Sequence, residues 1–200
     1  MSPETDTAGD ARHYPQLNVA TALTWMRIAA IPAVAMVFYW PGHWSRPLSC
    51  LVFTLAGLTD LLDGYLARRL GQTSKFGAFL DPVADKLMVA VVLILIVQAD
   101  PRVAVALAAA VIIGREIAVS ALREWMAELG ARSRVAVSGI GKAKTTLQMI
   151  GLGAMLYRHD LRGLPVYDIG FALLIVAAVI TLWSMVGYVR ATWPGRAGNR

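Results

Sequence analysis

Charge is scarce in this chain. Asp, Glu, Lys and Arg together make up 16% of its 200 residues, compared with about 25% in a typical soluble domain. Cysteine is nearly absent, and a single residue, Cys50, excludes an internal disulfide framework. Hydrophobic residues account for 57% of the sequence. This balance is typical of an integral membrane protein.

Apolar runs separated by short polar links occupy most of the chain. A helix that crosses a bilayer needs about 20 residues, so six of them use about 120 and leave no room for a separate soluble domain. We predict an all-α membrane domain over residues 16–190, a flexible tail at 1–15 and a basic tail at 191–200. The six predicted membrane-spanning helices cover residues 18–40, 48–66, 76–98, 103–122, 135–157 and 166–188, and residues 123–134 are expected to form a charged link.

Positive charge predicts the orientation in the membrane. The first ten residues are polar and acidic and lack the basic start of a signal peptide, so the first helix is expected to stay in the mature protein. Basic residues favour the cytoplasmic side, which predicts both termini and the acidic site there. The net charge is +6, and the basic residues lie between apolar runs. Membrane topology therefore explains the positive charge, and no nucleic-acid partner is expected. Only four of the 19 Lys and Arg residues fall on the other side: Arg46, Arg102, Arg158 and Arg162.

Four aspartates stand out between residues 60 and 86. Asp60 and Asp63 are three residues apart, and Asp81 and Asp85 are four apart. On helices these spacings place each pair on one face, so two helices can bring four carboxylates to one point. Hard cations such as Mg²⁺ or Mn²⁺ prefer these oxygens. A carboxylate inside a membrane costs about 2.5–3.5 kcal/mol on insertion scales, which favours a functional site over a structural ion-pair network with nearby Arg and Lys.

The same stretch resembles the signature of the CDP-alcohol phosphotransferases, D-x2-D-G-x2-A-R-x8-G-x3-D-x3-D. Eight specified residues at fixed spacing make the match highly specific. The resemblance implies the fold of that family and two metal ions, Mg²⁺ or Mn²⁺, held by the four aspartates. It also implies that Asp85 acts as base toward the acceptor hydroxyl. The matching residues are Asp60, Asp63, Gly64, Ala67, Arg68, Gly77, Asp81 and Asp85.

The resemblance also implies a site for CDP-diacylglycerol. Gly64, Arg68 and Ser74 match positions that hold the CDP portion, although Thr73 could take the place of Ser74.

A polar stripe at the start of the first helix has two interpretations. Asn18, Thr21, Thr24 and Arg27 recur every third residue and share one slanted face. The stripe is either a capping and snorkelling helix end or a wall of the CDP-diacylglycerol headgroup site. The family's N-x5-T-x2-R pattern, matched here by Asn18, Thr24 and Arg27, supports the second interpretation.

Segments in the second half of the chain resemble the bacterial phosphatidylglycerophosphate synthases. The likeness extends over residues 18–188 and implies that sn-glycerol 3-phosphate receives the phosphatidyl group of CDP-diacylglycerol, with release of CMP. A multi-pass protein of the bacterial inner membrane and a homodimer are expected. The segments are Arg115-Glu116-Ile117, Ser120-Ala121-Leu122-Arg123-Glu124 and Gly141-Lys142-x-Lys144-Thr145-x-x-Gln148.

Four cationic residues are candidates for binding the acceptor's phosphate: Arg115, Arg123, Lys142 and Lys144. Lys142 and Lys144 are separated by about 200° around a helix, so both cannot face one site. Lys144 shares a face with Gly141 and Gln148, which favours it. Alternatively, both lysines only mark the cytoplasmic side of the membrane.

Other functions fit part of the pattern. A same-fold enzyme could use another acceptor, as in a cardiolipin synthase or an inositol-phosphate or serine enzyme. A cation transporter could use the carboxylates as a relay. Transporters often contain internal repeats with matching broken helices, and the sequence shows none.

Overall fold

The computed structural model describes residues 19–70, 75–128 and 139–192, without the side chains of residues 19–21, 23, 60–70, 75–79, 123, 127, 139–143 and 186–192. These ranges form six α-helices, with one isolated bridge between Leu161 and Leu164 in the last connection. The all-α prediction is therefore confirmed for the described ranges. The helices are α1 (Val19–Phe38), α2 (Ser45–Leu70), α3 (Lys75–Ala99), α4 (Val103–Glu128), α5 (Gly139–Tyr157) and α6 (Val166–Thr192).

Most helix boundaries fall close to the predicted ones, and α4 is the main exception. It continues through residues 123–128, which were expected to belong to a link. Arg, Glu, Met and Ala in this segment are good helix formers, and Met126 is 7% exposed. The charged pattern therefore belongs to an amphipathic last turn of the helix.

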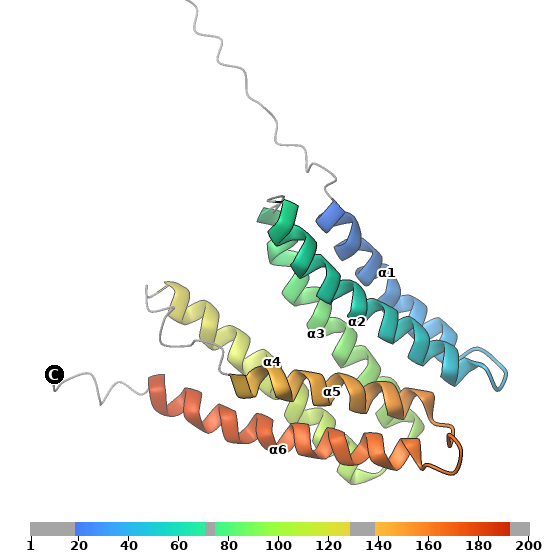
Figure 1. The fold of residues 1–200 in the computed structure, drawn as a ribbon. Coiled ribbons are helices and arrows are strands. Elements are labelled where there is room, and N and C mark those ends of the chain that lie inside the picture. The colour runs from blue at the N-terminus through green and yellow to red at the C-terminus, as the bar shows by residue number, and fades with distance from the viewer. Residues whose placement is uncertain (1–18, 71–74, 129–138, 193–200) are drawn as a thin grey trace, which may run out of the picture.

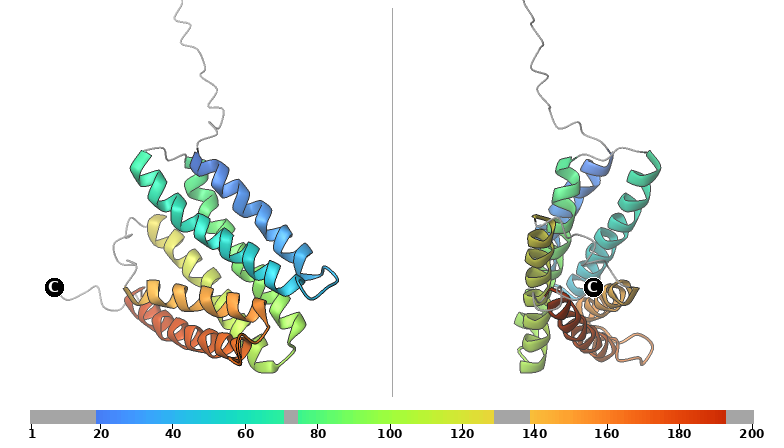
Figure 2. Two further views of the ribbon diagram at one scale, coloured as in Figure 1. Left: turned by 45° about the vertical axis from the view of Figure 1, so that its right-hand side comes forward. Right: turned by 90° about the vertical axis from the view of Figure 1, so that its left-hand side faces the viewer.

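The six helices pack as a bundle in which helices that are distant in the sequence also lie side by side (Figure 1). Helix α1 packs on α2 and α3, α5 packs on α6 and α2, and α4 packs on α3 and α6. The short connections α1–α2, α3–α4 and α5–α6 lie toward one end of the bundle, as both further views also show (Figure 2). The opposite end therefore carries the first turns of α1, α3 and α5.

The connections at the first end are fixed by local chemistry. Gly42 has φ of +137°, a conformation that suits glycine, in the turn before α2. Pro165 precedes α6 and Asp168 lies in its first turn, where negative charge interacts favourably with the helix dipole.

An ion pair at the α3–α4 connection ties it to α6. Asp100 accepts hydrogen bonds from Arg102 Nε at 3.0 and 2.9 Å, and the Tyr167 hydroxyl also donates to its carboxylate. The hydrogen bonds from Arg102 hold the pKa of Asp100 down at about 2, although partial burial opposes this shift. The Arg102 guanidinium lies 4.6 Å from the ring centre of Phe171. This cluster fixes the α3–α4 connection at the opposite end of α3 from Asp81 and Asp85.

Helices α5 and α6 approach each other closely where two glycines, Gly151 and Gly170, face each other. A Cβ added at Gly170 would lie 2.8 Å from both the Ala154 Cβ and the Gly151 carbonyl oxygen. A Cβ at Gly151 would lie 2.9 Å from the Gly170 carbonyl oxygen. The missing side chains therefore allow the two backbones to come into contact, as small residues do in membrane helix pairs.

Large apolar side chains cover much of the outer surface. Trp183 is 81% exposed, Val103 73% and Trp40 69%. A soluble monomer rarely exposes apolar patches of this extent, so the surface indicates a membrane protein. Two described segments, Val103–Met126 and Val166–Met185, are long and apolar enough by themselves to cross a membrane. Six helices are confirmed within the described ranges, and two of them are candidate membrane spans by length and composition.

Candidate active site

The acidic part of the site is held between α1 and α3. Asp81 and Asp85 lie one turn apart on α3, as their spacing predicts. Thr24 Oγ1 donates a hydrogen bond to Asp81 Oδ1 at 2.6 Å. Arg27 Nη1 lies 3.2 Å from Asp85 Oδ1 and 3.9 Å from Asp81 Oδ1. Thr24 and Arg27 therefore contact the very carboxylates that the sequence assigns to metal binding.

Thr24 and Arg27 make these contacts from buried positions on α1. Thr24 is 1% exposed and Arg27 is 2% exposed, while the side chains of Asp81 and Asp85 are 40% and 47% exposed. A buried guanidinium needs paired negative charge, because its desolvation is otherwise uncompensated. The two aspartates provide this charge and still present oxygen atoms to a ligand.

The donor set fits a hard divalent cation. Carboxylate oxygens from Asp81 and Asp85 are the ligands that Mg²⁺ and Mn²⁺ prefer, and both remain accessible. Asp60 and Asp63 lie on α2, where side chains are outside the described set. Within the described side chains alone, no three acidic, His or Cys groups converge. The complete four-aspartate site therefore stays a prediction.

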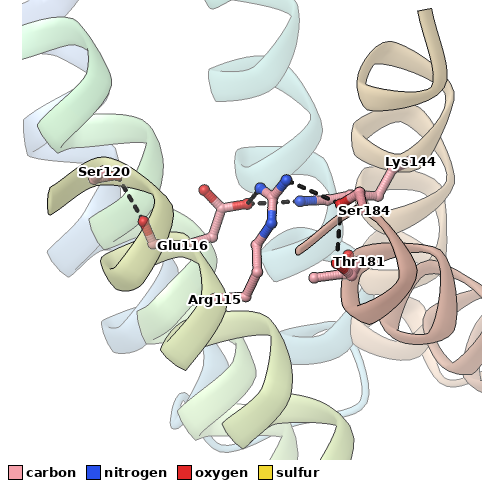
Figure 3. Close-up of polar contacts among 6 residues, drawn as sticks. All are labelled: Arg115, Glu116, Ser120, Lys144, Thr181 and Ser184. Atoms are coloured by element: carbon pink, nitrogen blue, oxygen red, sulfur yellow. Dashed lines mark hydrogen bonds and ion pairs between the residues drawn. The ribbon is translucent and has the colours of Figure 1, made fainter. Parts of the chain in front are cut away.

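A second charged cluster joins α4, α5 and α6 (Figure 3). Lys144 Nζ donates to Glu116 Oε1 at 2.8 Å, and Arg115 Nη1 lies 3.4 Å from the same oxygen. Arg115 Nη2 donates to Ser184 Oγ at 3.2 Å, and Ser184 Oγ donates to the Thr181 carbonyl at 2.9 Å. Two cationic groups from different helices thus meet at one carboxylate oxygen.

This cluster is mostly buried. The side chains of Lys144 and Arg115 are 3% and 8% exposed, whereas Glu116 is 27% exposed. Its backbone carbonyl accepts a hydrogen bond from Ser120 Oγ at 2.6 Å. The two cations are therefore enclosed by protein, and Glu116 is the member that faces open space.

One cavity of about 820 Å³ brings the two clusters together. Its polar wall includes residues of both, and it continues into an apolar region between α2 and α5. The polar wall contains Arg27, Asp85, Lys86, Glu116, Thr145 and Gln148. The apolar wall contains Phe53, Met88, Val89, Met149, Ile150 and Tyr157. A ligand with a charged head and an apolar tail matches this division.

The structure thus brings together Thr24, Arg27, Asp81 and Asp85 in one group, and Arg115 and Lys144 in another. Several predicted site residues cannot be placed in this way. Asn18 and Ser74 lie outside the described residues, and the predicted residues with undescribed side chains are Thr21, Asp60, Asp63, Gly64, Arg68, Arg123 and Lys142.

Sequence reasoning missed two residues of the cationic cluster. Glu116 was noted only as part of a motif, although a carboxylate within the apolar stretch of a predicted membrane helix is itself a signal of function. Ser184 carried no signal, because its role depends on contact with a residue 69 positions earlier.

The family described as CDP-alcohol phosphatidyltransferase matches residues 17–183. The chain belongs to this family. The match includes the aspartate signature on α2 and α3 and Arg115, Glu116 and Lys144 of the cationic cluster, and it ends one residue before Ser184.

Bacterial relatives in the family are similar over most of the chain. A protein of Salmonella typhimurium is 52% identical over 176 residues, which cover 88% of this chain and 95% of the relative. A protein of Pectobacterium atrosepticum is 53% identical over the same shares. Both are named CDP-diacylglycerol--glycerol-3-phosphate 3-phosphatidyltransferase.

A solved structure supports the fold. The apo form of phosphatidylinositol phosphate synthase from Mycobacterium tuberculosis has a TM-score of 0.57 to this chain and covers 91% of it, with 92% of its own chain covered. Its sequence is 24% identical. This likeness confirms the family fold and does not bear on the acceptor.

Proposed function

We propose that this protein transfers the phosphatidyl group of CDP-diacylglycerol to sn-glycerol 3-phosphate, producing phosphatidylglycerophosphate and CMP in phospholipid biosynthesis. One observation carries the proposal: a single cavity is lined both by Asp85 of the family signature and by Glu116, which contacts Lys144 and Arg115. This arrangement suits a nucleotide lipid on one side and a phosphorylated acceptor on the other. The 52% identity to enzymes of this name supports the choice of acceptor.

We infer that all six helices cross the membrane, with the active site facing the cytoplasm. The exposed apolar side chains and the two strongly apolar helices support membrane crossing, and the distribution of basic residues supports the cytoplasmic side for the site. The apolar part of the cavity would then receive an acyl chain, and its polar end would open toward soluble substrates. The homodimer stays a prediction.

In this proposal, the chain's own residues position both reactants. Asp60, Asp63, Asp81 and Asp85 would hold two Mg²⁺ or Mn²⁺ ions. Bound there, the ions would supply charge neutralisation on the diphosphate and on the departing CMP. Gly64, Arg68 and Ser74 would bind the CDP portion, with the stripe at Asn18, Thr21, Thr24 and Arg27 beside it.

The bond changes involve the acceptor hydroxyl and the β-phosphorus. Asp85 would accept the hydroxyl proton as the oxygen attacks, because a carboxylate within hydrogen-bond reach can act as general base. The new oxygen–phosphorus bond forms while the bond from that phosphorus to the CMP oxygen breaks. Arg115 and Lys144, with Arg123 and Lys142 as further candidates, would orient the acceptor through its phosphate.

The decisive experiment is an acceptor panel with purified protein and CDP-diacylglycerol. Release of CMP and the mass of the lipid product are measured with glycerol 3-phosphate, inositol phosphate, serine and phosphatidylglycerol. We expect product only with glycerol 3-phosphate, and loss of CMP release when a chelator removes divalent cations. Product with phosphatidylglycerol instead would indicate a cardiolipin synthase. No CMP release with any acceptor would reject the transferase function and reopen the transporter alternative.

A further inference from the structure

Glu116 occupies the position between two cations where an acceptor's phosphate is expected. Its Oε1 receives Lys144 Nζ at 2.8 Å and lies 3.4 Å from Arg115 Nη1 (Figure 3). Lysine and arginine converge in the same way on phosphate oxygens, because both donate charge-assisted hydrogen bonds. The carboxylate therefore already fills the place of an anionic oxygen in this pocket.

The cations are more deeply buried than the carboxylate between them. Arg115 is anchored by Ser184, which is itself bonded to the Thr181 carbonyl, and both cationic side chains are less than 9% exposed. Glu116 is 27% exposed and lines the cavity. Rotation of its side chain into the cavity would uncover the two cations without moving them.

Charge balance argues against simultaneous binding of Glu116 and a phosphate. A phosphate monoester carries about −1.5 to −2 charges at pH 7, and a carboxylate on the same two cations would repel it. The other charged groups that line this cavity, among the side chains the structure describes, are Lys86 and Asp85 from α3 and Arg27 from α1. Arg27 already pairs with Asp85 at 3.2 Å, so Lys86 is the cation of this described set that could receive a displaced Glu116.

We propose that Glu116 is a built-in competitor for the acceptor's phosphate, which must displace it from Lys144 and Arg115 in order to bind. The inference rests on the proposed function for the identity of the acceptor. An acceptor that carries a phosphate can replace both contacts of Glu116. A neutral alcohol cannot, so Glu116 keeps its contacts with both cations until a phosphorylated acceptor arrives and thereby selects for it.

Glu116→Gln tests the proposal because it keeps the shape of the side chain and removes the competing charge. The KM for glycerol 3-phosphate should fall by at least about threefold, since one repelling unit charge is lost from the site. Inorganic phosphate should become a stronger competitive inhibitor by a similar factor. The KM for CDP-diacylglycerol should not change. Glu128→Gln, at the exposed end of the same helix, is the matched control and should leave all three values unchanged.

The opposite direction would overturn the inference. If Glu116→Gln raises the acceptor KM, Glu116 positions the two cations and does not compete with phosphate. An unchanged KM and an unchanged phosphate inhibition also refute competition. Thermal unfolding in detergent shows whether the Glu116→Gln variant is folded. If it is not folded, Glu116→Asp is measured instead, because its shorter side chain weakens the contacts with both cations. The KM for glycerol 3-phosphate should then also fall, and a rise would refute the proposal.

Failure of the proposed function would look different. In that case the unsubstituted protein would release CMP with an acceptor other than glycerol 3-phosphate, or without any acceptor. Inhibition of any CMP release by inorganic phosphate can still be compared between the unsubstituted protein and Glu116→Gln. The competitor role is thus tested separately from the identity of the acceptor.

Discussion

Replacing Asp85 by Asn separates its expected role as a base from its contacts in the fold. The carboxylate lies 3.2 Å from Arg27, lines the cavity and is 47% exposed, so a substrate hydroxyl can reach it. Asn keeps the shape of the side chain and one oxygen ligand but cannot accept a proton. Turnover should therefore fall by roughly 10²–10⁴-fold, the usual contribution of a general base.

The same substitution should have a limited effect on stability. Arg27 is 2% exposed and would lose a charged partner, but Asp81 remains 3.9 Å away and Thr24 still holds Asp81. Breaking a buried ion pair completely costs about 3–5 kcal/mol, whereas losing one of two charged contacts should cost about 1–3 kcal/mol. The variant should therefore remain folded in detergent while losing most of its activity.

Three measurements decide the outcome: CMP release, thermal unfolding, and direct binding of a CDP compound with and without Mg²⁺. Asp160→Asn, in an exposed connection, is the matched control for the change of charge. Asp60→Asn, Asp63→Asn and Asp81→Asn should abolish activity in a folded protein by removing a metal ligand. If Asp85→Asn loses nucleotide binding as completely as Asp60→Asn does, Asp85 is mainly a ligand. Turnover within about tenfold of the unsubstituted enzyme would refute the base role.

Three further predictions concern other parts of the bundle. Arg115→Ala and Lys144→Ala should each raise the KM for glycerol 3-phosphate far more than that for CDP-diacylglycerol; equal effects on both substrates in steady-state assays would place these residues elsewhere. Gly170→Ala should lower the Tm, because the added methyl group meets α5 at 2.8 Å and such overpacking costs about 1–3 kcal/mol; Gly114→Ala, with open space around it, is the control and should not lower the Tm. Asp100→Asn should lower the Tm at neutral pH. Since the pKa of Asp100 is lowered from 3.8 to about 2 on folding, its contribution is fully present above about pH 4 and is lost as the pH falls toward 2. The difference in Tm between the two proteins should therefore narrow only below about pH 4, and a constant difference down to pH 2 would contradict the pKa shift.

The helices were predictable because the apolar runs and their breaks are local features. Pro41 and Gly42 mark the first turn and Asp100 with Pro101 the second, and both fall between helices in the structure. The continuation of α4 through residues 123–128 was not predictable from charge alone. A charged segment with one apolar face can extend a helix when a residue such as Met126 is buried by tertiary packing.

The site was predictable to the extent that it depends on spacing along one helix. The four-residue separation of Asp81 and Asp85 places both on one face of α3, and both contact Arg27. Partners from different helices were not deducible in the same way. Lys144 contacts Glu116, which lies 28 positions earlier in the sequence. Helical periodicity contains no information on contacts between different helices. The shared helical face favours Lys144 over Lys142, and Lys144 is buried in the cationic cluster. The side chain of Lys142 is outside the described set, so the preference stays a prediction.

The polar stripe on α1 gains a more specific interpretation from its contacts. Neither capping nor snorkelling explains Thr24 and Arg27, because both are nearly fully buried and each contacts an aspartate of α3. A three-residue spacing places them one turn apart on α1, and their partners Asp81 and Asp85 are one turn apart on α3. Two helices are therefore joined by matched polar pairs at the level of the proposed metal ligands. In the proposed function, α1 would therefore affect CDP-diacylglycerol binding by orienting these carboxylates, in addition to any contact with the headgroup itself.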